Sequence, residues 1–106
     1  MDEYIQIQST VSSVAEAREI IEVLFEKELI ACASIIPSVE SYYLEEEELV
    51  CEQEVKIFIK TVADLYASIE KIIKKYHSYD IPEILVFSIE DGNEEYLRWM
   101  SKQVSK

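Results

Sequence analysis

The chain has 106 residues, with 22 acidic side chains against 10 basic ones and a formal net charge of −12. This length predicts one domain, spanning residues 1–106. The negative field repels phosphate, so nucleic acid and anionic membrane surfaces are not expected as partners. Cations or a positively charged protein partner fit the charge better, although the same charge can serve solubility alone.

The sequence shows no signal for export or membrane insertion. Its start, Met-Asp-Glu-Tyr, lacks a basic segment followed by an apolar one, and no apolar run approaches the ~20 residues of a membrane helix. The two cysteines, Cys32 and Cys51, do not form a Cys-x-x-Cys pair. We therefore expect a cytoplasmic protein with reduced thiols, and the spacing alone predicts no disulfide.

Residues 4–10 alternate apolar and polar side chains, which predicts a first strand. Ser12 or Ser13 can then begin a helix, and Glu16, three residues after Ser13, completes a capping-box pattern. The helix is expected to reach about residue 29. Its predicted apolar stripe consists of Val14, Ala17, Ile21, Leu24 and Phe25.

Residues 31–61 contain two arms rich in β-branched and aromatic side chains, on either side of the acidic segment 45–48. This is the pattern of a long β-hairpin. In the second arm Val55, Ile57 and Ile59 alternate with mostly polar residues, so one row is expected to be buried. Pro37 lies inside the first arm and cannot donate to a ladder, so the strand must bend, bulge or lie at an edge there.

A second helix is expected after the hairpin, capped by Thr61 or Asp64. Lysines enrich its C-terminal half, where cations suit the negative end of the helix dipole. Residues 77–83 are expected to form a connector. The predicted buried stripe of this helix consists of Leu65, Ile69, Ile72, Ile73 and Tyr76.

Residues 84–89 form a near-continuous apolar run, which predicts a last, central strand. Asn93 can cap a final helix over about 94–104, with Tyr96, Leu97 and Met100 on one side. The resulting order, βαββαβ and a C-terminal helix, predicts an α+β, ferredoxin-like fold with an antiparallel sheet and two helices on one face. We expect no helix over the other face, which other subunits would then bury.

Five short motifs occur in order along the chain. They are Ala31-Cys32-Ala33-Ser34-Ile35-Ile36-Pro37, Ser41-x-Tyr43, Glu54-Val55 with Ile59-Lys60-Thr61, His77-x-Tyr79-x-x-Pro82-Glu83, and Tyr96-Leu97-x-Trp99. In order and spacing they resemble the CutA family, the divalent-cation-tolerance proteins, over almost the whole chain.

The resemblance implies a ferredoxin-like fold assembled as a homotrimer through the hairpin and the sheets, similar in architecture to the PII signalling proteins. It also implies binding of copper or similar divalent metals, with no established catalytic reaction. The copper ligands proposed in a relative are a cysteine and two adjacent histidines. At those positions this chain has Ser9, Tyr76 and His77, so only the histidine matches.

His77, the only histidine, is the best candidate for a metal ligand, since imidazole binds transition metals. Such sites need about three or four ligands, so nearby carboxylates or a second subunit would have to supply the others. A structural role for His77 at the end of the helix stays open. Cys32 is a ligand or cleft candidate, with a small core side chain as the alternative.

A cleft between subunits is the second candidate site. Glu54 and Lys60 lie six residues apart on one predicted strand and therefore on the same face. Opposite charges there could hold a small ligand or form a salt-bridge network between subunits. The residues expected to line the cleft are Cys32, Glu54, Lys60, Tyr79, Glu83 and Trp99.

Two functions remain open on the sequence. The first is a non-enzymatic trimeric protein that binds divalent cations, copper or similar metals, at His77 and nearby carboxylates. The alternative is a PII-like small-ligand sensor, or a scaffold that docks a protein partner. The acidic segment 45–48 suits hard cations weakly and is otherwise a solvated tip. A hydrolase is disfavoured, because the sequence has no Gly-rich phosphate loop and no nucleophile with a nearby histidine.

Overall fold

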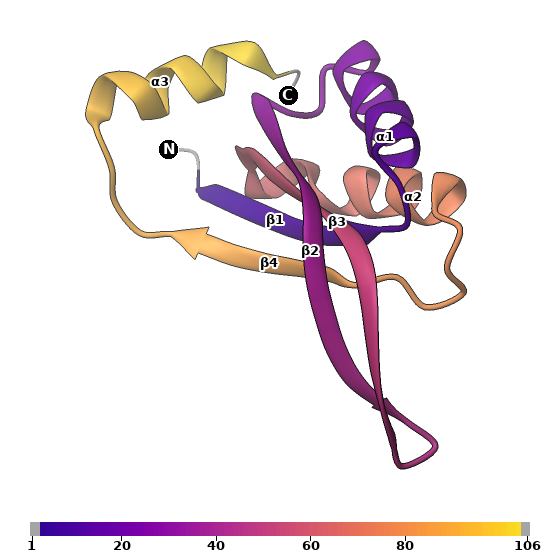
Figure 1. Ribbon diagram of the computed structural model, residues 1–106. Coiled ribbons are helices and arrows are strands. Elements are labelled where there is room, and N and C mark those ends of the chain that lie inside the picture. Colours follow the sequence, from indigo (N-terminus) through magenta and orange to yellow (C-terminus); the bar gives the residue numbers. More distant parts are fainter. Residues whose placement is uncertain (1–2, 105–106) are drawn as a thin grey trace.

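The computed structural model describes residues 3–104 and contains four strands and three α-helices in the predicted order (Figure 1). The α+β, ferredoxin-like fold expected from the sequence is therefore confirmed. The elements are β1 (Tyr4–Val11), α1 (Val14–Glu26), β2 (Cys32–Glu45), β3 (Glu48–Val62), the 3-10 turn η1 (Ala63–Leu65), α2 (Tyr66–Tyr76), β4 (Ile84–Ile89) and α3 (Glu94–Gln103).

The four strands form one antiparallel sheet in the order β2-β3-β1-β4. The prediction that the last strand is central was wrong, because β4 lies at an edge. Its continuous apolar run suggested burial on both faces. In the chain by itself, Leu85, Val86 and Phe87 remain 44–48% exposed.

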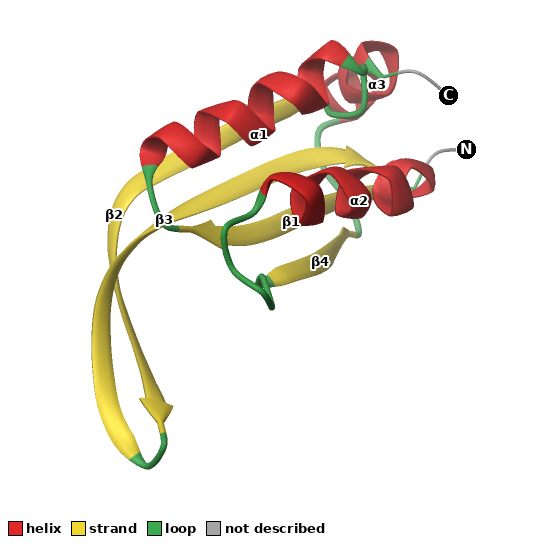
Figure 2. Ribbon diagram, turned by 90° about the vertical axis from the view of Figure 1, so that its right-hand side faces the viewer, coloured by secondary structure: helices red, strands yellow, loops and turns green. Residues whose placement is uncertain are grey.

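One face of the sheet is buried under helices, and we call it the dry face. Alternate residues of β1 and β3, among them Ile7, Ile57 and Ile59, are buried in a core that α1 and α2 cover together (Figure 2). The period of two in these strands predicted this face, and the two helices lie on it as expected. We call the opposite face the open face.

The helix α1 begins where the sequence predicted, with Ser13 accepting a hydrogen bond from the backbone N–H of Glu16. It ends at Glu26 and not near residue 29, because Glu28 adopts a left-handed conformation with φ 57° and closes the helix. Its buried stripe is centred on Ala17, Ile20 and Leu24. Phe25, predicted to be buried, is exposed because it lies about 100° around the helix from Leu24.

The predicted caps of the second helix were wrong. Thr61 is buried in β3, where its hydroxyl donates to the backbone oxygen of Leu29 at 2.6 Å. Asp64 falls in η1, and α2 starts after Leu65 with no side-chain cap. Ile69 and Ile73 of the predicted stripe are fully buried, and Leu65, Ile72 and Tyr76 pack partly buried against the core.

The β2–β3 hairpin extends well past the rest of the sheet, and the molecule measures 46 × 26 × 21 Å (Figure 1). The register of the two strands shifts between Ile36 and Val39, which places a bulge at Pro37 on an edge strand, as predicted. At the tip Glu45 pairs with Glu48, and the two residues between them, Glu46 and Glu47, both have positive φ. This is a tight two-residue turn.

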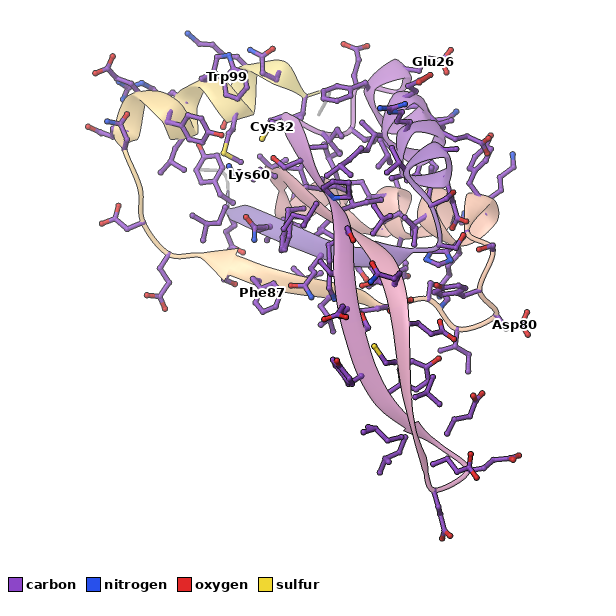
Figure 3. All side chains as sticks on the ribbon, in the orientation of Figure 1. Glu26, Cys32, Lys60, Asp80, Phe87 and Trp99 are labelled. Carbon is purple, nitrogen blue, oxygen red and sulfur yellow. The ribbon has the colours of Figure 1, made fainter. Side chains whose placement is uncertain are left out.

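The expectation that no helix covers the other face of the sheet was wrong in part. The helix α3, capped by Asn93 as predicted, lies over one end of the open face. The Tyr4 hydroxyl lies 2.7 Å from Oγ of Ser101, and Met100 is fully buried. The rest of the open face remains uncovered, and Figure 3 shows Phe87 on β4 away from the helices.

Candidate functional site

The residues predicted to line a cleft fall into two groups within one chain. Glu54 and Lys60 do share the open face of β3, but six residues of strand separate them by about 20 Å. Glu54, Tyr79 and Glu83 gather where the hairpin leaves the sheet. Cys32, Lys60 and Trp99 gather under or on α3, at the opposite end of the sheet (Figure 3).

The first group is held together by hydrogen bonds between three elements. The Tyr79 hydroxyl, from the connector after α2, donates to Oε2 of Glu54 on β3 at 2.6 Å. Oε2 of Glu83 accepts hydrogen bonds from Gln8 at 2.9 Å and Thr10 at 3.0 Å, both on β1. Connector and strands are thereby fixed to one another.

Lys56 completes this network. Its Nζ lies 3.1 Å from Oε2 of Glu83 and 2.9 Å from Oγ1 of Thr10. Sequence reasoning missed Lys56, Gln8 and Thr10. Lys56 stands between Glu54 and Lys60 in the same alternating row, and both β1 residues belong to the polar row of that strand. The alternation placed these residues on one face, but only the antiparallel register brings them opposite each other.

The electrostatics of this group follow from its contacts. Burial alone would raise the pKa of Glu83, but hydrogen bonds from Gln8, Lys56 and Thr10, with the Lys56 charge, hold that pKa below its usual value. Burial, followed by the hydrogen bond to Glu54, raises the pKa of Tyr79. Glu83 is therefore anionic and the Tyr79 phenol neutral at neutral pH.

A groove runs between this network and the base of the hairpin. It has a volume of about 500 Å³, and we call it the hairpin-base groove. A larger hollow of about 680 Å³ lies between β1, β4 and α3, and none of the predicted site residues lines it. The residues lining the hairpin-base groove are Thr10, Ser41, Tyr42, Tyr43, Glu52, Glu54, Tyr79, Ile81 and Glu83.

The second group centres on Tyr96 of α3. Its hydroxyl lies 3.7 Å from Sγ of Cys32 and accepts from Nζ of Lys60 at 3.4 Å, and its ring stacks on Trp99 with centroids 5.5 Å apart. Cys32 and Lys60 are direct partners across the β2–β3 ladder. The arrangement fastens α3 to the open face, and Cys32 is half-buried and not part of the main core.

His77 adjoins the first group, with its ring 4.9 Å from the ring of Tyr79 and its side chain fully buried. The backbone N–H of Tyr79 donates to Nδ1 at 3.0 Å, so the proton of the neutral ring sits on Nε2 and is donated to the backbone oxygen of Thr10 at 2.7 Å. Nε2 thus holds the connector to β1, and Nδ1 holds the turn within the connector. A metal could bind His77 only after one of these bonds was broken.

Glu16 supports the same connector. It accepts hydrogen bonds from the backbone and hydroxyl of Ser78, and its Oε2 lies 3.5 Å from Nδ1 of His77. Burial would raise the pKa of Glu16, but these bonds, with one from Ser12, lower it below its usual value. A negative Glu16 therefore ties α1 to the start of the connector.

The residues described, 3–104, contain no group of three or more His, Cys, Asp or Glu side chains able to hold a metal ion. Cys32 and Cys51 are both free thiols. None of the helices described is long and apolar enough to cross a membrane. Within residues 3–104, one chain alone therefore brings at most two such side chains to a single metal ion.

Comparison with known sequences identifies the relatives of this chain. Residues 5–103 match the family model described as CutA1 divalent ion tolerance protein. The chain is 37% identical over 100 residues to the divalent-cation tolerance protein CutA of Thermus thermophilus, covering 94% of this chain and 95% of that protein. It is 35% identical to a CutA homolog of Danio rerio, of whose length it spans 59%.

Solved structures agree with the sequence comparison. The divalent ion tolerance protein CutA1 from Ehrlichia chaffeensis superposes with a TM-score of 0.94 at 28% identity, covering 100% of this chain and 99% of that one. CutA from Archaeoglobus fulgidus, described as a periplasmic divalent cation tolerance protein, superposes with a TM-score of 0.91 at 31% identity over 96% and 99% of the two chains. Sequence and fold together place this chain in the CutA family of divalent-cation tolerance proteins.

Proposed function

We propose that this protein is a non-enzymatic homotrimer that binds divalent cations in the cytoplasm. The observation that carries the proposal is the match of residues 5–103 to a divalent ion tolerance family, combined with a net charge of −12. The same match supports cation binding over a small-molecule sensor.

The open face supports assembly. Ile36, Leu85 and Phe87 are exposed large apolar side chains on it, and the hairpin adds Leu44 and Leu49. An apolar surface of this kind on a small domain is the usual mark of a protein interface. The two edge strands, β2 and β4, each have one side without a neighbouring strand among the residues described, so further copies would cover strand edges as well as side chains.

The acidic hairpin tip supports cation binding better than His77 does. Glu45 and Glu48 are direct cross-strand partners, and like charges placed opposite each other destabilise a hairpin. A divalent cation between them would relieve the repulsion, with water or other subunits supplying further oxygen ligands. Carboxylates favour hard cations such as Mg²⁺ or Mn²⁺, so copper fits the described geometry less well.

The test measures mass and metal uptake separately. Light scattering should give about three times the chain mass of 12.4 kDa. Equilibrium dialysis against Mg²⁺, Mn²⁺ and Cu²⁺ should show saturable uptake that weakens in the double variant Glu45→Gln/Glu48→Gln. A variant with the same charge change on the exposed side of α1, Glu19→Gln/Glu22→Gln, is the control.

Each part of the proposal can fail by itself. A monomer at working concentration would remove the trimer, whatever the metal data show. Equal uptake by the tip variant and the control would remove the tip as the cation site. Copper uptake that His77→Gln abolishes would restore the histidine as a ligand and imply that the connector rearranges.

A further inference from the structure

The hairpin-base groove has walls of two kinds. Tyr43 and Tyr79 present aromatic rings, and Ile81, 91% exposed, presents an uncovered aliphatic side chain. Glu52, Glu54 and Glu83 present carboxylates. An aromatic and aliphatic wall next to carboxylates is suited to a ligand that is both apolar and positively charged.

The charges in the groove do not cancel. Lys56 is the cation bonded to the network, and it is committed to Glu83 and Thr10. Three carboxylates against one ammonium leave two negative charges, at Glu52 and Glu54. A tyrosine hydroxyl screens Glu54 but brings no positive charge to it.

The negative charge of these carboxylates also raises the pKa values of the two neighbouring tyrosines. The neighbouring Glu52 carboxylate, which favours the protonated phenol, raises the pKa of Tyr43 to about 12, with further contributions from burial and from the charges of Glu45 and Glu54. The hydrogen bond to Glu54 and the charge of Glu52 add to burial in raising the pKa of Tyr79. Both phenols stay neutral across the neutral range, so they give the groove an uncharged aromatic surface.

We propose that the hairpin-base groove binds an alkyl diamine or polyamine. One ammonium group would lie between Glu52 and the Tyr43 ring and another beside Glu54 and Tyr79, where carboxylates and aromatic faces both attract cations. The methylene chain between them would pack on Ile81. An excess of two negative charges matches a ligand with at least two positive ones.

Other ligand classes fit the groove less well. An anion or a nucleotide would meet the uncompensated carboxylates. A bare metal ion would bind the carboxylates alone and would leave Ile81 and the aromatic rings of the groove without a partner. Because the groove is built from residues of one chain, the inference does not depend on the metal site proposed above.

The test is titration calorimetry of the protein in its native assembly with spermidine, at fixed ionic strength. Glu54→Gln and Glu52→Gln should each weaken binding about tenfold, since each removes one charge-assisted contact. The matched control is Glu46→Gln, which makes the same charge change at the hairpin tip and does not line the groove. It should bind spermidine as the unaltered protein does.

Three results would overturn the proposal. One is the absence of binding heat at millimolar spermidine, and another is equal weakening in Glu46→Gln and Glu54→Gln, which would mean general attraction to an acidic protein. The third is displacement of spermidine by Mg²⁺ at equal charge concentration, which would mean that the groove does not use the methylene chain. Circular dichroism and light scattering of each variant separate lost binding from lost folding or assembly.

Discussion

The same strands form both faces of the sheet, yet one face is a buried apolar core and the other carries polar side chains and the groove. On β1, Ile5 and Ile7 face the helices and are buried, whereas Gln6 and Gln8 face the other way. The first face supplies the stability of the fold and contains almost no polar group. The second carries the hydrogen-bonded network, the groove and the exposed apolar side chains through which we propose that copies assemble. Neighbouring residues of one strand therefore lie on opposite faces, one in the core and the next on the face that carries the candidate site.

The largest effect is expected on the dry face. Ile7→Ala removes a fully buried side chain between Ile59 and Val86 and should lower the free energy of unfolding by about 2–5 kcal/mol. The neighbouring change on the open face, Gln6→Ala, should cost less than about 1 kcal/mol. Urea denaturation at matched protein concentration measures both, and a cost for Gln6→Ala as large as that for Ile7→Ala would erase the contrast between the faces.

A smaller effect belongs to the network on the open face. The folded pKa of Glu83 lies below its usual value of 4.5, so the unfolded chain takes up its proton first as the pH falls. The stability due to Glu83 is therefore present above about pH 4.5 and is lost as the pH drops through the lower, folded pKa. For a partly exposed carboxylate it should amount to on the order of 1 kcal/mol.

The measurement is the free energy of unfolding between pH 6 and pH 3 for the unaltered protein and for Glu83→Gln. The variant should lose less stability across this interval, because glutamine does not titrate. Glu94→Gln, at a carboxylate whose side chain is 88% exposed, is the control and should leave the slope unchanged. If Glu83→Gln keeps the full acid sensitivity, the lowered pKa of Glu83 is not what stabilises the protein.

The sequence predicted what depends on local pattern. Alternation placed β1 and β3, Pro37 predicted the bulge, and Ser13 and Asn93 were correct as caps. The errors concern contacts between distant segments, which no local pattern contains. Thr61 looked like a cap until its hydroxyl was found to donate to Leu29, and α3 was not expected over the open face. Lys56 was missed for the same reason, because its ion pair with Glu83 joins two segments that are distant in the sequence.

The smallest effect is expected at Ser9, a polar residue on the dry face, and here the substitution should raise the free energy of unfolding and not lower it. Ser9 is fully buried among apolar side chains, and its Oγ has no hydrogen-bond partner among the residues described. A buried hydroxyl without a partner costs free energy, so Ser9→Ala should leave stability unchanged or raise it by up to about 1 kcal/mol. Thr61→Ala is the matched control, because it removes a buried hydroxyl that does donate a hydrogen bond, and it should destabilise. If both variants destabilise equally in urea, Ser9 has a partner that the chain by itself does not supply.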